Sequence, residues 1–600
     1  MRKWPVDGGG GVGPCSATAK LRMNIERKAI CRRPNTSEHA LPKELHPVLA
    51  RIYAARHVVS ADELEHSLDR LHPPELLKDI GAAVDLLASS IISNQRILVV
   101  ADFDADGATS CAVALRALKA MGARHVGYVV PNRFEYGYGL TPEIVALAAE
   151  QAPNLLITVD NGISSIDGVR AAHERGMSVL ITDHHLPASQ LPPADAIVNP
   201  NQPGDTFPSK NLAGVGVIFY VMMALRGHLR QRGWFSNSAH KEPNLAQLLD
   251  LVALGTVADV VTLDYNNRIL VRQGLARISG NRTCAGIRAL LRVSGRAQPR
   301  ITSSDLGFFV GPRLNAAGRL HDMSLGIECL LTDDDATAEE MAHGLDVLNH
   351  ERRTIEVDMQ SQALDAVDAL RLGADLPKGL CLFDQRWHQG IIGLVAARVK
   401  ERVHRPVIAF APAGEDQLKG SARSIPGLHI RDALDALAAR HPGLLYKFGG
   451  HAMAAGLSLD RAKYDDFCQA FEQEVDLQLC DEDLADRVMS DGELTAAELT
   501  LELAGLLRAS GPWGQGFPEP LFDGEFDILE RRVVGDKHLK MTLRAHDQAR
   551  AVGAIAFNHA PNGEPPDWSR AHAAYKLDVN EYQGYRSLQL IIQYMEPAEQ

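Results

Sequence analysis

An apolar run that ends in three alternating acidic residues constrains this chain more than any other feature. Residues 96–101 read Arg-Ile-Leu-Val-Val-Ala, and Asp102, Asp104 and Asp106 follow on alternate positions. The run predicts a strand buried on both faces. A helix-compatible segment, 108–121, comes next, so the acids are expected at the carboxyl end of a strand, where open α/β sheets build their sites. Carboxylates this close repel one another unless a cation holds them, and oxygen ligands favour Mg²⁺ or Mn²⁺.

Three other interpretations fit the acidic segment less well. An EF-hand loop needs a bidentate Glu at position twelve, which is Val113 when counted from Asp102. Haloacid-dehalogenase-type phosphatases carry Asp-x-Asp-Gly-Thr after a strand, whereas Ala108 here separates the glycine from Thr109. A plain polar turn seldom carries three alternating acids directly after an apolar strand. The segment therefore favours a divalent metal site.

Two more predicted strands end in residues that can bind metal. Residues 154–159 lead into Asp160 and an Asn-Gly pair, and residues 178–182 lead into Asp-His-His at 183–185. Strands and helices alternate through this region, which predicts a parallel sheet whose strands end at one edge. The three motifs are therefore expected at a single site. The expected strands lie near 96–101, 125–130, 154–159, 178–182 and 195–198.

A fourth acidic group follows the apolar segment 251–258. Asp259 comes directly after Gly-Thr-Val-Ala in that segment. Burying an acid there is costly unless the acid is paired or bound to metal. A helix-end Asp that faces water explains the pattern equally well.

Composition narrows the class of protein. The net charge of −13 leaves room for nucleic-acid binding only at a local patch. The eight cysteines are scattered without a Cys-x-x-Cys pair, which predicts reduced thiols in a cytoplasmic protein. No apolar run reaches the length of a membrane span, and the N-terminus lacks a signal-peptide core.

A chain of 600 residues should form several domains. The Gly-rich N-terminus predicts disorder, with Met23 as an alternative start, and short segments of alternating polarity near the C-terminus predict a small barrel. The predicted segments are a disordered extension (1–41), a helical preface (42–94), an α/β catalytic domain (95–332), a connecting helix (333–377), a smaller α/β substrate-binding domain (378–460), a helical linker (461–491) and an OB-fold-like domain that binds single strands (492–600).

The order of these motifs resembles the DHH phosphoesterase superfamily. Flanking segments at 131–134, 137–140, 212–216 and 311–319 resemble its bacterial exonucleases that are specific for single-stranded DNA. The likeness covers the chain from about residue 42 to the C-terminus. It implies a DHH parallel-sheet catalytic domain, a long connecting helix, a smaller α/β DHH-associated domain and a C-terminal OB-fold β-barrel.

The resemblance also implies roles for particular residues. Asp160 would bridge two divalent cations, Mn²⁺ or Mg²⁺. Asp183 would orient a histidine, while Asp102 and His185 are either metal ligands or phosphate contacts. Trp387 would stack on a base or lie in the core. The implied metal ligands are Asp102, Asp104, Asp106, Asp160, His184 and Asp259; the catalytic set is Asp104, Asp106, Asp160, His184, His185 and Asp259; the DNA contacts are Arg313, Arg319, His388, Ser421, Arg423, Gly450 and His451.

The expected function is a metal-dependent 5′→3′ exonuclease. It would hydrolyse single-stranded DNA to 5′-mononucleotides by a two-metal mechanism, in DNA repair and recombination. The polarity comes from the resemblance, as do the expected partners, a single-stranded-DNA-binding protein and a helicase. We also expect a monomer that does not engage a membrane. The alternatives are a DHH phosphoesterase for short oligonucleotides or cyclic dinucleotides, a catalytically inactive DNA-binding scaffold and a soluble pyrophosphatase.

Overall fold

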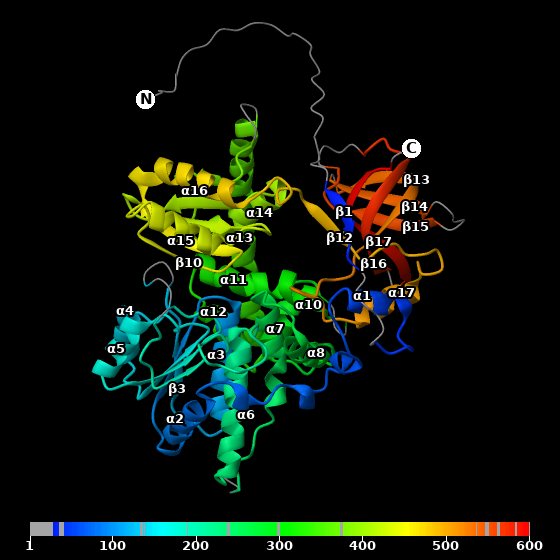
Figure 1. The fold of residues 1–600 in the computed structure, drawn as a ribbon. Helices are drawn as coiled ribbons and strands as arrows, with labels where there is room; N and C mark the ends of the chain where they lie inside the picture. The colour runs from blue at the N-terminus through cyan, green and yellow to red at the C-terminus, as the bar shows by residue number, and fades with distance from the viewer. Residues whose placement is uncertain are drawn as a thin grey trace.

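The computed structural model places three folded units around a central gap in the ribbon (Figure 1). It describes residues 28–34, 41–132, 136, 139–188, 190–236, 240–296, 300–371, 376–535, 537–545, 551–560, 565–582 and 585–598. Within these ranges, no helix is long and apolar enough to span a membrane. The flanking motifs at 131–134 and 137–140 lie partly outside the described residues.

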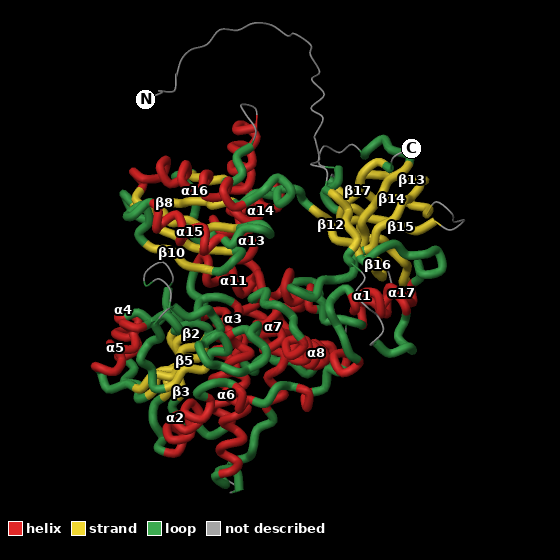
Figure 2. The backbone as a smooth tube through the Cα atoms, viewed as in Figure 1, coloured by secondary structure: helices red, strands yellow, loops and turns green. Residues whose placement is uncertain are grey.

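The catalytic unit contains the predicted five-stranded parallel sheet, in the order β3-β2-β4-β5-β6 (Figure 2). Its strands are apolar on both sides because helices cover both faces. Alternate residues such as Val99 and Leu98 pack into separate cores, the first with α2, α3 and α6, the second with α4 and α5. The elements are β2 (Ile97–Ala101), β3 (Val126–Val129), β4 (Leu155–Val159), β5 (Ser178–Thr182), β6 (Ala196–Val198), α2 (Ile80–Ile92), α3 (Ala105–Ala120), α4 (Pro142–Ala149), α5 (Ile166–Glu174) and α6 (Gly214–Gln231).

Helices complete this unit beyond the sheet and connect it to the next. The long helix α13 (Asp335–Arg371) lies within the segment predicted to connect the two lobes. The preface has one α-helix before α2, followed by three short 3₁₀ helices. The remaining elements are α1 (Pro47–Ala54), η2 (Ala61–Leu64), η3 (Leu68–Arg70), η4 (Pro74–Leu76), η5 (Leu245–Leu248), α7 (Leu249–Ala258), α8 (Tyr265–Ser279), α9 (Ala285–Val293), α10 (Ser303–Asp305), the π-helix η6 (Leu306–Val310), α11 (Gly311–Leu320) and α12 (Ser324–Leu331).

The second lobe is a mixed five-stranded sheet in the order β10-β11-β9-β8-β7. Three helices pack on it, in agreement with the predicted smaller α/β domain. Its elements are β7 (Leu380–Phe383), α14 (Ile392–Val403), β8 (Val407–Pro412), β9 (Gln417–Arg423), α15 (Ile430–Arg440), β10 (Lys447–Gly450), β11 (Ala454–Asp460), η7 (Arg461–Lys463) and α16 (Tyr464–Gln478).

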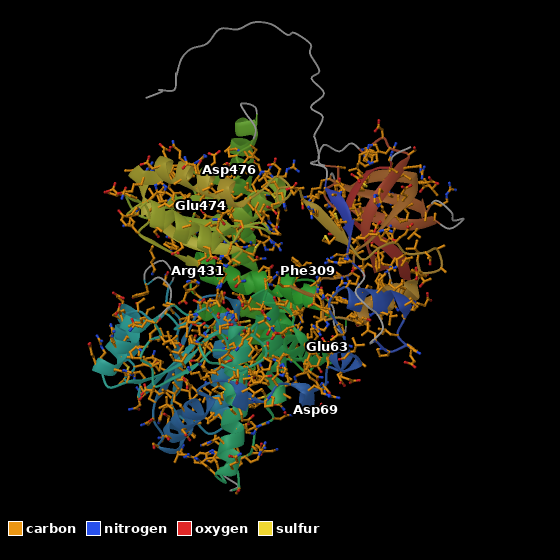
Figure 3. All side chains as sticks on the ribbon, viewed as in Figure 1. Glu63, Asp69, Phe309, Arg431, Glu474 and Asp476 are labelled. Carbon is orange, nitrogen blue, oxygen red and sulfur yellow. The ribbon has the colours of Figure 1, made fainter. Side chains whose placement is uncertain are left out.

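The prediction of a helical linker at 461–491 is wrong for α16. Phe467 and Phe471 of this helix are fully buried in the core of the second lobe, where Phe467 packs edge-on against Phe410. The helix carries many acids, including Glu474 and Asp476 (Figure 3). Because the helix contains so many acids, its composition suggested a solvated segment. Apolar residues nevertheless recur every four positions, at Phe467, Phe471 and Val475, and this face packs into the core.

The C-terminal unit is a closed barrel in the order β13-β14-β15-β17-β16, as the OB-fold prediction requires. Tyr53 of α1, Trp513 and Phe517 stack beneath it, with ring centroids 5.2–6.2 Å apart. Arg56 and Asp491 form a buried ion pair of 2.7 Å nearby. The elements are β12 (Arg487–Ser490), α17 (Leu501–Ala509), β13 (Phe522–Val534), β14 (His538–Ala545), β15 (Ala551–Ala556), β16 (Arg570–Tyr582) and β17 (Tyr585–Pro597).

The predicted disorder of residues 1–41 is wrong for a short strand, β1 (Ala29–Arg32). It pairs in parallel with β12, and Arg32 forms an ion pair of 2.8 Å with Asp523 of the barrel. These partners lie more than 450 positions away in the sequence, so local composition gave no sign of them. Residues 1–27, including Met23, and residues 35–40 lie outside the described residues.

Asp523 should make the stability of the barrel depend on pH. Burial alone would raise the pKa of its carboxyl, but hydrogen bonds from His572, Arg32 and Ser490 bring that pKa well below its ordinary value. The bond to Asp523 also raises the pKa of His572. The lowered Asp pKa gives stability that is present above about pH 3.9 and lost on acidification. The raised His pKa gives stability that is present below about pH 6.5 and lost as the pH rises through the folded-state pKa.

We therefore expect Asp523→Asn to lower the free energy of unfolding by about 1–3 kcal/mol near pH 6 and to flatten its pH dependence. Glu525→Gln is the matched control, because Glu525 is 51% exposed and pairs with Arg570 at the surface, where ion pairs contribute about 0–1 kcal/mol. Thermal denaturation across the range from about pH 2 to 9 measures both variants and covers the acidic loss as well as the loss at higher pH. A pH profile of Asp523→Asn that matches the parent protein would contradict this account.

Candidate active site

The predicted acids and histidines meet at the carboxyl edge of the parallel sheet. The loops after β2, β4 and β5 converge there with the C-terminal end of α7. Three groups of side chains place one potential ligand atom each within 4.8 Å of the others. These groups are Asp102, Asp104 and Asp160; Asp160, His184 and His185; and Asp106, His184 and Asp259.

Helix N-termini hold two of the acids. Asp104 caps α3 and accepts hydrogen bonds from the backbone N–H groups of Asp106 and Gly107, at 2.9 and 3.0 Å. Asp106 accepts from the N–H groups of Gly214 and Val215 at the start of α6, at 2.6 and 2.9 Å. The positive ends of two helix dipoles therefore offset part of the charge on these carboxylates.

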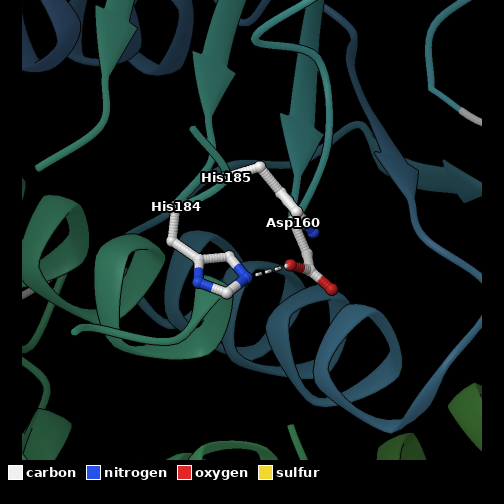
Figure 4. Close-up of side chains that lie close together, drawn as sticks. All are labelled: Asp160, His184 and His185. Atoms are coloured by element: carbon white, nitrogen blue, oxygen red, sulfur yellow. Dashed lines mark ion pairs between the residues drawn. The ribbon is translucent and has the colours of Figure 1, made fainter. Parts of the chain in front are cut away.

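Asp160 projects into the centre of the site from a left-handed backbone position, with φ of 63°. Such a conformation is uncommon outside glycine and occurs at functional turns. Its Oδ1 atom lies 3.2 Å from Nε2 of His184, and the dashed line in Figure 4 marks this pair. The same Nε2 atom lies 3.5 Å from a carboxylate oxygen of Asp259. A single imidazole nitrogen thus faces two acids from different elements.

The electrostatics of these groups fit a divalent cation. Burial, reinforced by repulsion from neighbouring acids, raises the pKa values of Asp106 and Asp160 well above the ordinary range. Burial lowers the pKa of His184, which favours the neutral form that binds metal. The Nε2 atom of His184 is buried and makes no well-aligned hydrogen bond to any described residue. Oxygen ligands with one imidazole suit Mn²⁺ or Mg²⁺.

Asp183 lies against His185, in the position expected of an orienting group. Its Oδ1 atom is 2.7 Å from Nδ1 of His185. Burial alone would raise the pKa of Asp183, but His185 and other donors lower it to about 2. Burial alone would lower the pKa of His185, but Asp183 raises it to about 9. The charged His185 is therefore suited to donate a hydrogen bond to an anion.

The second lobe closes the site from the opposite side. The ring of His451 stacks on that of His185, with centroids 5.5 Å apart and an interplanar angle of 25°. Burial lowers the pKa of His451 to about 4. Arg423 of β9 donates a hydrogen bond to Oγ of Ser421 at 3.1 Å. Gly450, with φ of 150°, approaches the backbone of β11 so closely that a side chain would collide with Ala455.

The remaining predicted DNA contacts fall into two classes. Arg319 donates to the carbonyl of Gly390 at 3.1 Å, and Nδ1 of His388 accepts from the N–H of Gly390, so both lie where the two lobes meet. Arg313 instead forms an ion pair of 2.7 Å with Asp346, and its side chain is only 7% exposed. Because α13 covers this guanidinium, the arrangement does not support Arg313 as a DNA contact.

Trp387 also lies in a core rather than on a surface. It is 6% exposed, and its indole N–H donates to Gln362 of α13 at 3.0 Å. The core alternative for this residue is therefore correct. Sequence reasoning missed Asn315, whose side chain accepts a hydrogen bond from the N–H of Ala105 at 2.8 Å. An Asn within a helical motif gives no local sign of a contact 210 positions away.

A side chain at Gly214 should displace Asp160. A Cβ atom built there would lie 2.6 Å from Cβ of Asp160, which forces one of the two residues to move. We expect Gly214→Ala to weaken Mn²⁺ binding about 10–100-fold, the usual effect of disturbing the support of a metal ligand. Isothermal titration calorimetry measures this. Gly227→Ala in the same helix is the matched control, because nothing lies within 4 Å of its Cβ position. Equal Mn²⁺ affinity in both variants would refute the expectation.

Comparisons with known proteins agree with the fold. Family models match at residues 96–256 (DHH family, N-terminal domain), 376–476 (DHHA1 domain) and 490–594 (RecJ OB domain). The chain is 55% identical over 577 residues to the single-stranded-DNA-specific exonuclease RecJ of Dickeya dadantii, covering 96% of this chain and 100% of that relative.

Two solved structures are similar along most of the chain. RecJ from Thermus thermophilus in complex with Mn²⁺ superimposes with a TM-score of 0.75 and 30% identity, covering 93% of this chain and 77% of that one. The complex of RecJ from the same organism with Mg²⁺ gives a TM-score of 0.71 and 28% identity, covering 93% and 76%. Because it is 55% identical to a RecJ protein over nearly the whole length of both chains, the chain belongs to the RecJ family of single-stranded-DNA-specific exonucleases.

Proposed function

We propose that this protein is a metal-dependent exonuclease that degrades single-stranded DNA in the 5′→3′ direction to 5′-mononucleotides. The observation that carries the proposal is the convergence of buried acids around His184, opposite His451 of the second lobe. Membership of the RecJ family supports the choice of single-stranded DNA. The polarity rests on the resemblance to that family.

The proposed ligands of two divalent cations are those predicted from the sequence. Several are buried acids whose pKa values are raised by burial and by their mutual repulsion, and a cation held between them would relieve that repulsion. When bound, two such ions activate a water molecule and neutralise charge on the phosphate. An imidazole among the ligands favours Mn²⁺ over Mg²⁺. The set is Asp102, Asp104, Asp106, Asp160, His184 and Asp259.

Other side chains are suited to hold the scissile phosphate. Asp183 raises the pKa of His185 and holds its ring through a contact of 2.7 Å, so His185 is suited to donate to a non-bridging oxygen. From the second lobe, Arg423 and Ser421 supply further donors, and His451 stacks on His185. We propose that these groups orient the phosphate on the face opposite the acids.

We propose that a longer single strand of DNA passes beside the barrel. A cavity of about 920 Å³ lies between α8, α10 and η6 on one side and α17 and strand β16 on the other. Its lining includes the guanidinium of Arg296, which lies 3.4 Å from the ring centroid of Phe309, and Phe308, which is 72% exposed. Aromatic rings beside guanidinium groups suit stacked bases and a phosphate backbone. A phosphoesterase that acts on short substrates would not need a cavity of this kind so far along the chain from its metal site.

The cellular setting follows from the same proposal. A nuclease of this kind would act in DNA repair and recombination in the cytoplasm, as a monomer. A helicase that exposes single strands and a protein that coats them are the partners expected from the family resemblance.

Hydrolysis should depend on Mn²⁺ and on a single-stranded 5′ end. A Mn²⁺ titration with DNA labelled at its 5′ end, beside matched duplex and RNA, measures both. Early release of labelled mononucleotide from the single strand alone supports the proposal. Late release of the label would reverse the proposed polarity. Cleavage of only very short oligonucleotides would favour the small-substrate enzyme, and binding without cleavage would favour an inactive scaffold.

Asp160→Asn should abolish hydrolysis while preserving the fold. Loss of a central ligand should lower kcat by more than the roughly 10–100-fold loss that is typical of outer-shell partners. Asp167→Asn on α5 is the matched control, because the Asp167 side chain is 81% exposed and, within the described part of the chain, forms an ion pair with Arg170 alone. Steady-state kinetics with saturating Mn²⁺ and circular dichroism measure activity and fold. Substantial hydrolysis by Asp160→Asn would remove Asp160 from the metal site.

A further inference from the structure

An Asn-Pro-Asn turn follows strand β6 and contacts the loop that carries the two histidines. The side-chain amide of Asn199 donates to the backbone carbonyl of His185 at 2.9 Å. The side-chain amide of Asn201 donates to the carbonyl of His184 at 2.7 Å and, more weakly, to that of Lys210 at 3.2 Å. Two amides from the neighbouring strand end therefore take the two carbonyl groups of the histidine pair, one each.

The N–H groups of the same two residues are held from the other side. Asp183 accepts both of them through its Oδ1 atom, at 2.7 Å from His184 and 3.1 Å from His185. The loop has left the sheet, so no strand ladder satisfies these backbone groups, and side chains do so instead. With donors on its carbonyls and an acceptor on its N–H groups, the backbone of the histidine pair is fixed in two directions.

The turn is itself well supported. Asn199 is fully buried, and its Oδ1 atom accepts a hydrogen bond from the N–H of Asn201 at 2.7 Å. Lys210 donates to the carbonyl of Pro200 at 2.6 Å and forms an ion pair of 2.7 Å with Asp205. Pro200 fixes its own φ angle. The two amides are therefore presented by a turn that is held in place before any metal binds.

We propose that Asn199 and Asn201 are positioning residues that fix the backbone of His184 and His185 and so set the placement of their rings. The inference deepens the proposed metal-dependent function and rests on it. Both asparagines contact the histidine pair through their side-chain amide nitrogens, which donate to backbone carbonyls. A side chain that only accepts hydrogen bonds cannot replace these amides, because the group that contacts a histidine carbonyl must donate.

Asn201→Asp gives the sharpest test, because it preserves the shape and replaces the donor with an oxygen that repels the carbonyl of His184. Asn201 is also only partly buried, so the exchange leaves the core intact. We expect Mn²⁺ affinity to fall about 10–100-fold. Asn201→Ala removes the donor without adding repulsion and should have a smaller effect of the same sign. It also keeps the proposal testable if the Asp variant does not fold.

Asn244→Asp is the matched control. Asn244 is exposed and uses its oxygen to accept a hydrogen bond from the N–H of Ala246 at 3.2 Å. An Asp keeps that acceptor, so the same chemical change should leave Mn²⁺ affinity unaltered. Asn201 makes its contact through the amide nitrogen, which Asp lacks, whereas Asn244 makes its contact through the amide oxygen, which Asp keeps.

Two measurements on the full-length protein decide the matter. Calorimetric titration with Mn²⁺ gives the affinity, and hydrogen exchange of the metal-free protein reports the amides of 183–186 directly. We expect faster exchange at these amides in Asn201→Asp, with the rest of the catalytic unit unchanged. Unchanged exchange and unchanged Mn²⁺ affinity would overturn the positioning role. A uniform rise in exchange across the catalytic unit would assign Asn201 to general stability instead.

Asp160→Asn serves as the reference arm. If it weakens Mn²⁺ binding and Asn201→Asp does not, the positioning inference fails and the metal site stands. If Asp160→Asn leaves Mn²⁺ binding unchanged, the proposed metal function fails, whatever the asparagine variants do.

Discussion

Repulsion between buried carboxylates is the constraint on which this structure depends. Asp102, Asp106 and Asp160 are each less than a tenth exposed, and burying several like charges together is strongly unfavourable. The fold offsets part of that repulsion with two helix N-termini, one at α3 and one at α6. Burial, together with the remaining repulsion, raises the pKa values of Asp106 and Asp160, and a divalent cation would relieve that repulsion. The same repulsion between carboxylates that destabilises the metal-free site therefore favours the binding of a metal ion.

Close packing around these acids explains residues that carry no reactive group. Gly214 must lack a side chain because the start of α6 touches Asp160. Gly318 of α11 is similarly restricted, since a Cβ atom there would collide with the carbonyl oxygen of Phe103. Asn315 of the same helix accepts from the first N–H of α3. Helices far apart in the sequence thus shape the loop of acids, and the metal site is a property of the whole catalytic unit.

Separate contacts hold the other two units in place around this site. The second lobe meets the catalytic unit through stacking of His451 on His185 and the hydrogen bond from Arg319 to Gly390. The barrel is anchored by two buried acids, Asp491 and Asp523, which bind arginines from the N-terminal region. A strand near the N-terminus therefore helps to place a domain near the C-terminus, while the long helix α13 connects the two lobes.

The amino-acid sequence by itself determined the parallel sheet, the position of the acids and histidines at strand ends, and the closed barrel. These follow from local periodicity and from the rule that parallel strands end at one edge. Only the tertiary structure decided that Arg313 faces Asp346, that α16 belongs to the second lobe, that Ala29–Arg32 forms a strand, and that Asn199 and Asn201 hold the histidine loop. Each of these depends on a partner that folding brings close, and the local sequence does not show which distant residue that partner will be.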